Sequence, residues 1–555
     1  MIQETCWEVA KDLPCLGVRR RVGLSATIPF LERCIRRFRT GPARLRWICM
    51  DKVLDVIFER SLAGQMLEGL PAEDQVLQTS SLRKGCRGVL PLDARLEPWM
   101  KRCLRSENLF DLVETYGSPL NLVRPRTMRR NVEELNAVAR ERGLDFRVFF
   151  ARKANKCLGF VDEAIESNFG VDTASENELR QCLQQCVPAK DLICTAAIKS
   201  DSLIDLCLQQ QVCIAVDNDD ELQVVVDRAN ELGRQARIAL RLGGFQHEGN
   251  KLPTRFGFDV DRDCDLPQRL TSLPVMVQGI HFHLDGYDAG QRVSALSVAM
   301  EWVERLRAVG QPVEFIDMGG GFPMSYLEEH RQWATFWKEH RRALLGERDT
   351  LTYRGHGLGL AIEGGRVVGQ PKMYPFFQRP VRGHWLAGVL DSRIEGKTIA
   401  DRLVELNVQL RCEPGRSILD GCGLTVARVE FRKQNAEGDW LIGLSMNRTQ
   451  CRTSSDDFLV DPILVPKQSS FGRATETKPM LGYLVGAYCT ESELISLRKM
   501  QFPSGVQRGD LIAFPNTAGY FMHFLESRSH QFPLAKNLIV DSHPVPSVRL
   551  DLIDE

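Results

Sequence analysis

No charge of either sign dominates this 555-residue sequence, because 72 lysines and arginines are matched by 72 aspartates and glutamates. A balanced chain lacks the broad positive field that attracts nucleic acid or an anionic membrane. The sequence also lacks any apolar run approaching the roughly 18 residues of a membrane span, and its N-terminus lacks the apolar core of a signal peptide. We therefore expect a cytoplasmic protein of small-molecule chemistry, with no nucleic-acid and no membrane partner.

The 17 cysteines lack the spacing of cysteine-based sites. They are scattered from Cys6 to Cys489, without the dense pattern of a disulfide-rich secreted domain or the paired CxxC elements of a zinc site. We expect most of these thiols to be reduced and buried, and we expect no bound metal.

Residues 1–90 differ from the rest of the chain in composition. Arginines cluster here, for example at Arg19, Arg20 and Arg21, while acidic residues such as Glu4 argue against an organellar transit peptide. We expect an N-terminal extension, either a short helical appendage or a poorly ordered segment, and assign it no function. Residues 91–127 are expected to lead into the fold and to pack, as a strand, on a C-terminal β-domain.

From residue 128 onward, short apolar runs bounded by turn residues alternate with amphipathic stretches. That alternation is typical of repeated βα units and of a parallel sheet. The eight runs are 146–151, 170–173, 192–196, 213–216, 237–242, 277–283, 314–318 and 408–412. Helices are expected between them, among others at 158–168, 176–185, 203–210, 220–232 and 293–309. Eight βα units predict an α/β fold with a closed (β/α)8 barrel, whose active site lies at the C-terminal ends of the strands.

Two further segments complete the expected organisation. Residues 324–405, between the seventh and eighth strands, are too long for one helix and indicate an insertion in the 128–416 barrel. It would be either a lid at the active-site rim or a surface elaboration. After residue 416 the helical period fades, and a β-domain is expected over 417–555. Its strand-like runs are 424–432, 440–444, 510–514 and 537–540.

Three segments at the expected strand ends suit cofactor chemistry. Lys153 follows directly on the first strand, so its amine is expected to point into the strand-end pocket. An imine-forming lysine belongs at such a position, and a solvated rim charge is the alternative. Three glycines at 319–321 follow the seventh strand, and Glu-Pro-Gly-Arg at 413–416 follows the eighth. Glycines let backbone amides approach a phosphate closely, and barrels often hold phosphates at these last two strand ends.

His283 ends the sixth strand. Its flat ring could stack on a heteroaromatic cofactor, and a hydrogen-bonded rim histidine is the alternative. Because His281 and His283 are two residues apart on a strand, they point the same way, as two ligands of a metal site would. No third ligand has suitable spacing, so a metal is not favoured.

These segments resemble the fold-type III pyridoxal-phosphate decarboxylases, which include diaminopimelate, ornithine and arginine decarboxylases, with the diaminopimelate branch most similar. Further matching segments are Gly-Val-Asp-Thr-Ala-Ser at 170–175, Thr-Arg-Phe-Gly at 254–257, Gly-Ala-Tyr-Cys at 486–489 and Ala-Gly-Tyr at 518–520. Each motif is modest alone, but their order along residues 95–545 is specific. The resemblance implies an alanine racemase-like barrel, a C-terminal β-domain, pyridoxal 5'-phosphate as cofactor, an amino-acid substrate and a homodimer.

The resemblance also implies roles for single residues. Lys153 would form the internal aldimine, His283 would stack on the cofactor ring, and Glu413 would face the pyridine nitrogen, where a carboxylate helps the ring to accept electrons. Cys489 matches a cysteine that reaches the active site from the other subunit and returns a proton, so the dimer would share its active sites. A buried structural thiol is the alternative for Cys489. The remaining implied cofactor contacts are Asp172, Arg241, Gly320, Gly321, Gly415 and Tyr520.

The sequence departs from the family pattern in two places. The family usually follows the stacking histidine with Gly-Ser, whose hydroxyl binds phosphate, but this sequence has Asp285 and Gly286. One phosphate contact is therefore missing or replaced. On the substrate side, Thr490 replaces an acid, and the pattern that grips the distal end of diaminopimelate is reduced to Arg452. Strict specificity for diaminopimelate is therefore not expected.

Other charged residues could still bind a substrate. Arg416 and Arg452 could clamp a carboxylate, and Glu491 or Glu493 could meet a distal amine. An ordinary surface charge or a structural salt bridge is the alternative for Arg452 and Glu493.

Three functions are compatible with these residues. The first is decarboxylation of an amino acid, which the Cys489 and Glu-Pro-Gly-Arg motifs favour. The second is a racemase or epimerase on the same fold, which would remove the α-proton instead of the carboxylate. The third is a catalytically inactive, decarboxylase-like regulator, against which the presence of Lys153, His283, Glu413 and Cys489 in one chain argues.

Overall fold

The structure is a computed structural model that describes residues 79–453, 457–467, 478–541 and 547–554. Of the extension expected over residues 1–90, positions 1–78 lie outside the described residues. The described chain opens with helix α4 (Thr79–Leu82) and strand β1 (Arg87–Gly88). Strand β1 pairs with β22 (Met500–Phe502), so the chain joins the C-terminal sheet before it enters the barrel.

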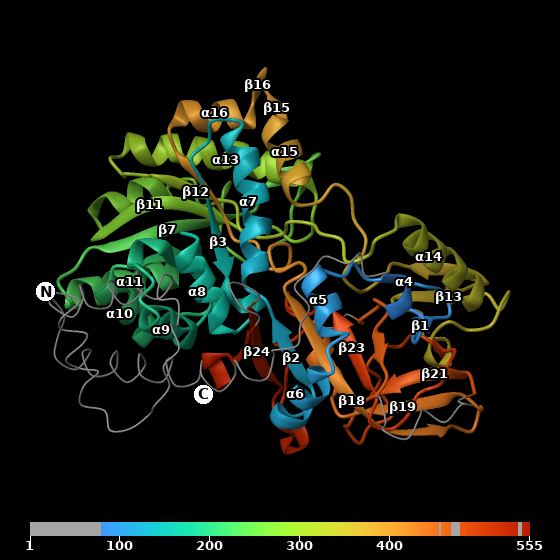
Figure 1. Ribbon diagram of the computed structural model, residues 1–555. Helices are drawn as coiled ribbons and strands as arrows, with labels where there is room; N and C mark the ends of the chain where they lie inside the picture. The colour runs from blue at the N-terminus through green and yellow to red at the C-terminus, as the bar shows by residue number, and fades with distance from the viewer. Residues whose placement is uncertain (1–78, 454–456, 468–477, 542–546, 555) are drawn as a thin grey trace, which may run out of the picture. The chain divides into compact units, whose positions relative to one another are not determined.

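Eight parallel strands close into a barrel (Figure 1). Each strand pairs with the next, and β17 pairs with β3 to complete the ring. The strands lie where the apolar runs predicted them, because a strand that is covered on both faces is apolar along its whole length. The predicted (β/α)8 barrel is confirmed. Its strands are β3 (Phe146–Ala151), β4 (Gly170–Thr173), β5 (Leu192–Cys194), β6 (Cys213–Val216), β7 (Ala236–Gly243), β11 (Val275–Phe282), β12 (Phe315–Asp317) and β17 (Gln409–Cys412).

Helices alternate with these strands along the chain. Helices α9, α10, α11 and α13 each begin after a polar side chain that accepts a hydrogen bond from the backbone N–H three residues on. Such caps satisfy backbone N–H groups that the first turn of a helix leaves unpaired. They thereby set the residue at which each loop ends and its helix begins. The helices are α7 (Arg126–Arg140), α8 (Leu158–Glu166), α9 (Glu176–Gln184), α10 (Asp201–Gln210), α11 (Asp219–Glu231), α12 (Leu266–Arg269) and α13 (Ala289–Ala308). Short strands β8 (Gln246–His247), β9 (Asn250–Lys251) and β10 (Phe258–Asp259) lie between α11 and α12.

A second, mixed sheet forms the C-terminal β-domain that the sequence predicted. Strand β2 precedes the barrel in the chain, yet it lies between β18 and β24, antiparallel to the first and parallel to the second. The chain therefore leaves this sheet for the barrel and returns to it. The strands are β2 (Leu120–Val123), β18 (Gly423–Gln434), β19 (Trp440–Leu444), β20 (Ile463–Val465), β21 (Met480–Val485), β22, β23 (Leu511–Pro515), β24 (Lys536–Asp541) and β25 (Ser547–Leu550), and helices α5 (Pro98–Cys103) and α6 (Asn108–Tyr116) precede β2.

Residues 324–405 divide between the two parts. The first half holds α14 (His330–Leu344) and the hairpin of β13 (Leu360–Glu363) and β14 (Arg366–Gly369), and its apolar side chains join the β-domain core. The second half holds α15 (Arg382–Asp391), β15 (Arg393–Ile394), β16 (Lys397–Thr398) and α16 (Ile399–Leu406). Its two helices pack into the barrel core (Figure 1). The first half is therefore an insertion in the barrel, whereas the second half supplies helices of the barrel itself.

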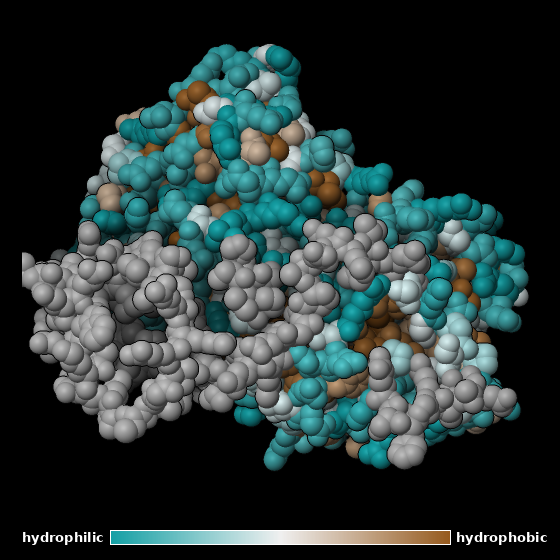
Figure 2. All heavy atoms as spheres, in the orientation of Figure 1, coloured by the Kyte–Doolittle hydropathy of each residue, from teal (hydrophilic) through white to brown (hydrophobic). Residues whose placement is uncertain are grey.

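On the face drawn in Figure 2 the described surface is mostly hydrophilic, with scattered hydrophobic patches. None of the helices in the described ranges is long and apolar enough to cross a bilayer. The cysteines of these ranges are free, and most are buried, with Cys186, Cys264 and Cys489 exposed.

Candidate cofactor and active site

Lys153 lies at the C-terminal end of β3, in a one-turn 3-10 helix (Arg152–Ala154). Its Nζ is 2.8 Å from Oδ2 of Asp172, which is fully buried on the neighbouring strand β4. Burial opposes the charge on the amine, but Asp172 and Glu413 outweigh it and raise the pKa of Lys153. The lysine is therefore protonated in this arrangement, and Asp172 is the base within reach of its proton.

The pKa of Asp172 is also raised. Burial and the nearby Glu413 raise its pKa, although the Lys153 ammonium and a hydrogen bond from the Thr195 hydroxyl oppose that shift. Lys153 thus lies at the C-terminal ends of the strands, where barrel enzymes carry their catalytic residues.

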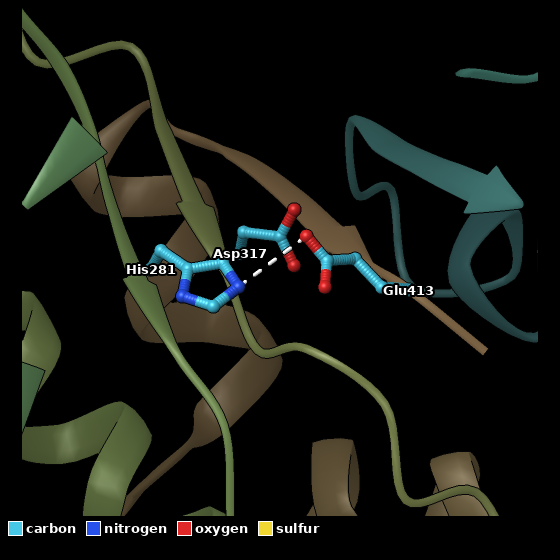
Figure 3. Close-up of side chains that lie close together, drawn as sticks. All are labelled: His281, Asp317 and Glu413. Atoms are coloured by element: carbon cyan, nitrogen blue, oxygen red, sulfur yellow. Dashed lines mark ion pairs between the residues drawn. The ribbon is translucent and has the colours of Figure 1, made fainter. Parts of the chain in front are cut away.

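Glu413 belongs to a buried group with His281 and Asp317 (Figure 3). The three residues lie at the C-terminal ends of β17, β11 and β12, and their exposed fractions are 3%, 0% and 0%. Nε2 of His281 is 3.3 Å from Oε1 of Glu413, and Oδ1 of Asp317 accepts a 2.9 Å hydrogen bond from the Gly319 N–H. Burial raises the pKa of both carboxyl groups and lowers that of His281. Because two adjacent buried carboxylates repel, this group favours holding a proton.

The same group is the one set of described residues whose ligand atoms, all within 4.8 Å of one another, could hold a metal ion. The histidine in it is His281, and His283 lies outside the set.

His283 faces the glycines that follow β12. A Cβ built on Gly319 would lie 3.2 Å from His283 Nδ1, and one on Gly320 would lie 3.7 Å from His283 Cε1. Burial, followed by the charges of Lys153 and Arg241, lowers the pKa of His283 to about 3. The ring is therefore neutral at neutral pH, as a ring that stacks on a heteroaromatic ligand should be.

Gly415 lies where the barrel meets a loop of the β-domain. A Cβ on Gly415 would lie 2.7 Å from the Tyr520 hydroxyl and 2.8 Å from Cβ of Ala154. Tyr520 donates its backbone N–H to Ala154 O at 2.8 Å and has a left-handed φ of 72°, which is uncommon for a bulky residue. The β-domain thus places Tyr520 beside the turn that carries Lys153.

Arg241, on β7, is a buried cation with unused donors. Its Nη1 is 3.4 Å from Oδ1 of Asp217, and its Cζ is 3.9 Å from the centre of the Phe256 ring. Nε and Nη1 donate no hydrogen bond within the described chain. Burial lowers the pKa of Arg241, which Asp217 partly offsets. An anionic or hydrogen-bond-accepting ligand at the strand ends would satisfy these donors.

Arg416 is enclosed by aromatic rings. Its Cζ is 4.1 Å from the Tyr374 ring centre and 4.9 Å from that of Phe521, and Nη1 donates to Gly519 O at 3.3 Å. Tyr374 comes from residues 324–405, so that segment contributes a wall beside the strand ends. Sequence reasoning missed this contribution, because no local pattern ties a tyrosine to a distant arginine.

The other predicted substrate residues make different contacts. Arg452 donates to Leu494 O at 2.9 Å and lies 3.4 Å from Asp457, as a structural salt bridge does. The Glu491 side chain is 91% exposed and comes no nearer than 3.9 Å to Arg354. In the described ranges neither residue bonds to the strand-end group, and the structure does not bring them together with Lys153.

Comparison with known proteins agrees with this geometry. Residues 128–370 match the pyridoxal-binding domain of the pyridoxal-dependent decarboxylases. The uncharacterised protein y4yA of Sinorhizobium fredii is 30% identical over 454 residues, which are 80% of this chain and 93% of that protein. The diaminopimelate decarboxylase of Vibrio cholerae is 23% identical over 467 residues, covering 80% and 92%. The chain belongs to the pyridoxal-dependent decarboxylase family.

The fold agrees with that assignment. The crystal structure of Helicobacter pylori diaminopimelate decarboxylase with L-lysine matches at a TM-score of 0.59 and 18% identity, covering 80% of this chain and 95% of that one. The cofactor of this pyridoxal-dependent decarboxylase is pyridoxal phosphate. The residues present fit it, since Arg241 has unused donors and the missing Cβ of Gly415 lets the strand-end backbone approach the Tyr520 hydroxyl closely.

Gly415→Ala should weaken both the fold and cofactor binding. The added methyl would press on Tyr520 and Ala154, and overpacking of this kind costs about 1–3 kcal/mol of unfolding free energy. Urea unfolding of the apoprotein and titration with pyridoxal phosphate measure the two effects. Gly388→Ala, in α15, is the matched control, because a Cβ there meets no atom within 4 Å. Equal behaviour of the two variants would contradict the tight fit at Gly415.

Proposed function

We propose that this protein decarboxylates an amino acid related to diaminopimelate, with Lys153 as the residue that carries the cofactor. The observation that supports Lys153 most directly is its 2.8 Å contact with the buried Asp172 at the barrel strand ends. The curated relatives named diaminopimelate decarboxylase support a substrate of this class. A decarboxylase is favoured over a racemase because the Cys489 and Glu-Pro-Gly-Arg segments match the decarboxylases.

Each strand-end residue has a definite task in this proposal. Pyridoxal phosphate, when bound, supplies a ring that accepts the electron pair left by departing carbon dioxide. Asp172 holds the Lys153 side chain at the strand ends through the 2.8 Å contact between its Oδ2 and Nζ. Glu413 holds a proton at the ring nitrogen. The neutral ring of His283 stacks on the cofactor and excludes water from that face.

The residues that bind the substrate are the part of the proposal that the fewest contacts in the structure support. Arg416 directly follows Gly415 in the chain, and its aromatic surroundings keep the guanidinium in one orientation. We assign it to a carboxylate or to the phosphate. The structural salt bridge of Arg452 and the exposure of Glu491 support a substrate other than diaminopimelate.

A substrate screen tests the proposal. The purified protein with pyridoxal phosphate is incubated with meso-diaminopimelate, lysine, ornithine, arginine and the neutral amino acids, and both released carbon dioxide and optical rotation are followed. Carbon dioxide from at least one charged amino acid is expected. Loss of rotation without carbon dioxide would establish a racemase instead, and neither signal would support the inactive regulator.

A homodimer with shared active sites is the second element of the proposal. Cys489 is exposed, and its neighbour Tyr488 stacks on His530 with ring centres 5.0 Å apart, so the loop that carries the thiol is anchored. An anchored, exposed thiol suits a residue that would enter the active site of a partner subunit and there donate a proton to the substrate carbon that has lost its carboxylate.

Mixing two inactive variants tests this sharing. Lys153→Ala and Cys489→Ala homodimers should each be severely impaired. In a mixed dimer one site carries both lesions and the other carries neither. Random exchange makes about half of the dimers mixed, so activity should return to roughly a quarter of wild type. If both residues came from one chain, every site would keep a lesion and mixing would restore nothing.

A further inference from the structure

Arg292 is a fully buried cation in the first turn of α13, with an exposed fraction of 0%. Its Nη2 donates to Leu284 O at 2.9 Å and to Gly286 O at 2.8 Å, and Nη1 lies 3.5 Å from Asp285 O. One guanidinium therefore holds three consecutive carbonyls of the loop that follows β11 and His283. This loop carries Asp285 and Gly286, where the sequence departs from the family pattern.

The same guanidinium lies against the third glycine of residues 319–321. A Cβ built on Gly321 would lie 2.1 Å from Arg292 Nη2 and 2.9 Å from Gly286 O, and the φ of Gly321 is 85°. No side chain fits there without displacing Arg292. The arginine therefore joins the loops that follow β11 and β12, and the loop after β12, the seventh strand, is one of the two where a barrel commonly binds a phosphate.

The charge of Arg292 is not matched at close range. Every hydrogen bond of its guanidinium in the described ranges goes to a backbone carbonyl. Burial lowers the pKa of Arg292 to about 10, with Asp288 and Asp285 opposing the shift, so the group stays charged at neutral pH. A buried cation that carbonyls alone hold has a high desolvation cost, and an anion nearby relieves it.

We infer that Arg292 is the positioning residue for the cofactor phosphate: it fixes residues 284–286 and Gly321 around the phosphate and supplies the positive charge behind them. It thereby takes the place of the serine hydroxyl that the family pattern would put at position 286. The inference concerns the cofactor alone, so it does not depend on which amino acid is decarboxylated or on Cys489.

Binding of cofactor with and without its phosphate tests the inference. Full-length apoprotein is titrated with pyridoxal phosphate and with pyridoxal, using tryptophan fluorescence, for the wild type, Arg292→Gln and Arg292→Lys. Arg292→Gln should weaken pyridoxal phosphate binding about tenfold or more, because the loops around the phosphate are no longer held and a nearby positive charge is lost, while pyridoxal binding stays within about twofold. The affinity of Arg292→Lys for pyridoxal phosphate should lie between those of the wild type and Arg292→Gln, because lysine keeps the charge but not the planar guanidinium.

Arg305→Gln is the matched control on the same helix. Arg305 is exposed, with its Cζ 4.8 Å from the Trp302 ring centre, and its removal should change neither titration. A merely structural role for Arg292 would weaken pyridoxal and pyridoxal phosphate equally, and that result would overturn the inference.

A second measurement tests the inference even if Arg292→Gln folds poorly. Inorganic phosphate should raise the Tm of wild-type apoprotein, because it binds the folded state, and should raise it less in Arg292→Lys. If Arg292→Gln does not fold, Arg292→Lys decides in both assays. Unchanged discrimination between pyridoxal phosphate and pyridoxal in that variant, together with an unchanged phosphate response, would refute a role at the phosphate.

Discussion

Lys153→Ala should reduce turnover to the limit of detection and remove the covalent attachment of the cofactor. No other described lysine has its amine beside Asp172 at the strand ends, 2.8 Å from that carboxylate. Borohydride reduction of the wild-type holoenzyme, followed by peptide mass analysis, should place a pyridoxyl group on the peptide that contains Lys153. A variant that still carries a reducible label on another lysine would show that the assignment is wrong.

Two controls separate chemistry from folding. Lys153→Arg keeps a cation for Asp172, so the fold should survive, but its guanidinium stays protonated and cannot act as a nucleophile. It should be as inactive as the alanine variant. Lys156→Ala removes a neighbouring lysine whose Nζ is 2.6 Å from Glu526 Oε2 and should keep the label on Lys153. If only the Lys156 variant lost the label, Lys156 and not Lys153 would be the lysine that binds the cofactor.

The barrel was predictable because each of its strands is a continuous apolar run between turn residues. For the runs at 146–151, 170–173 and 213–216, the predicted bounds equal the bounds of the observed strands. Residues 324–405 were harder, since the apolar period does not say which core a helix joins. Helices α15 and α16 belong to the barrel, whereas α14 belongs to the β-domain core.

At the site, the sequence allowed us to predict residues at the ends of strands. It did not allow us to predict residues that lie on helices, or contacts that form only when the barrel strands pair. Arg292 is in helix α13, where an arginine is ordinarily expected to face water, and only the fold puts it behind Gly321. Asp317 and His281 were visible as strand residues, but their contact with Glu413 arises from the pairing of β12 with β17 and β11. Arg452 and Glu491 were chosen by motif position, and their observed partners lie elsewhere.

Glu413→Gln should keep the fold and much of the cofactor binding but slow turnover by about a hundredfold to a thousandfold, which corresponds to a loss of about 2–4 kcal/mol in the transition state. The carboxylate is proposed to hold a proton on the ring nitrogen, and a neutral amide cannot stabilise that cation. The fold should survive, because glutamine has nearly the same shape and burying it does not carry the desolvation cost that burial imposes on Glu413.

Asp317→Asn is the matched control within the same buried group. Burial and the neighbouring Glu413 raise the pKa of Asp317, so that carboxyl favours its neutral form, and asparagine keeps the oxygen that accepts the Gly319 N–H. Single-turnover release of carbon dioxide, measured with cofactor bound to saturation, should therefore fall by the full factor in Glu413→Gln and by less than about tenfold in Asp317→Asn. Equal losses would mean that the group acts as one hydrogen-bonded unit, and an unchanged rate in Glu413→Gln would remove this glutamate from the mechanism. Because both variants replace a buried carboxyl by an amide at neighbouring strand ends, a difference between them isolates the charge that faces the ring nitrogen.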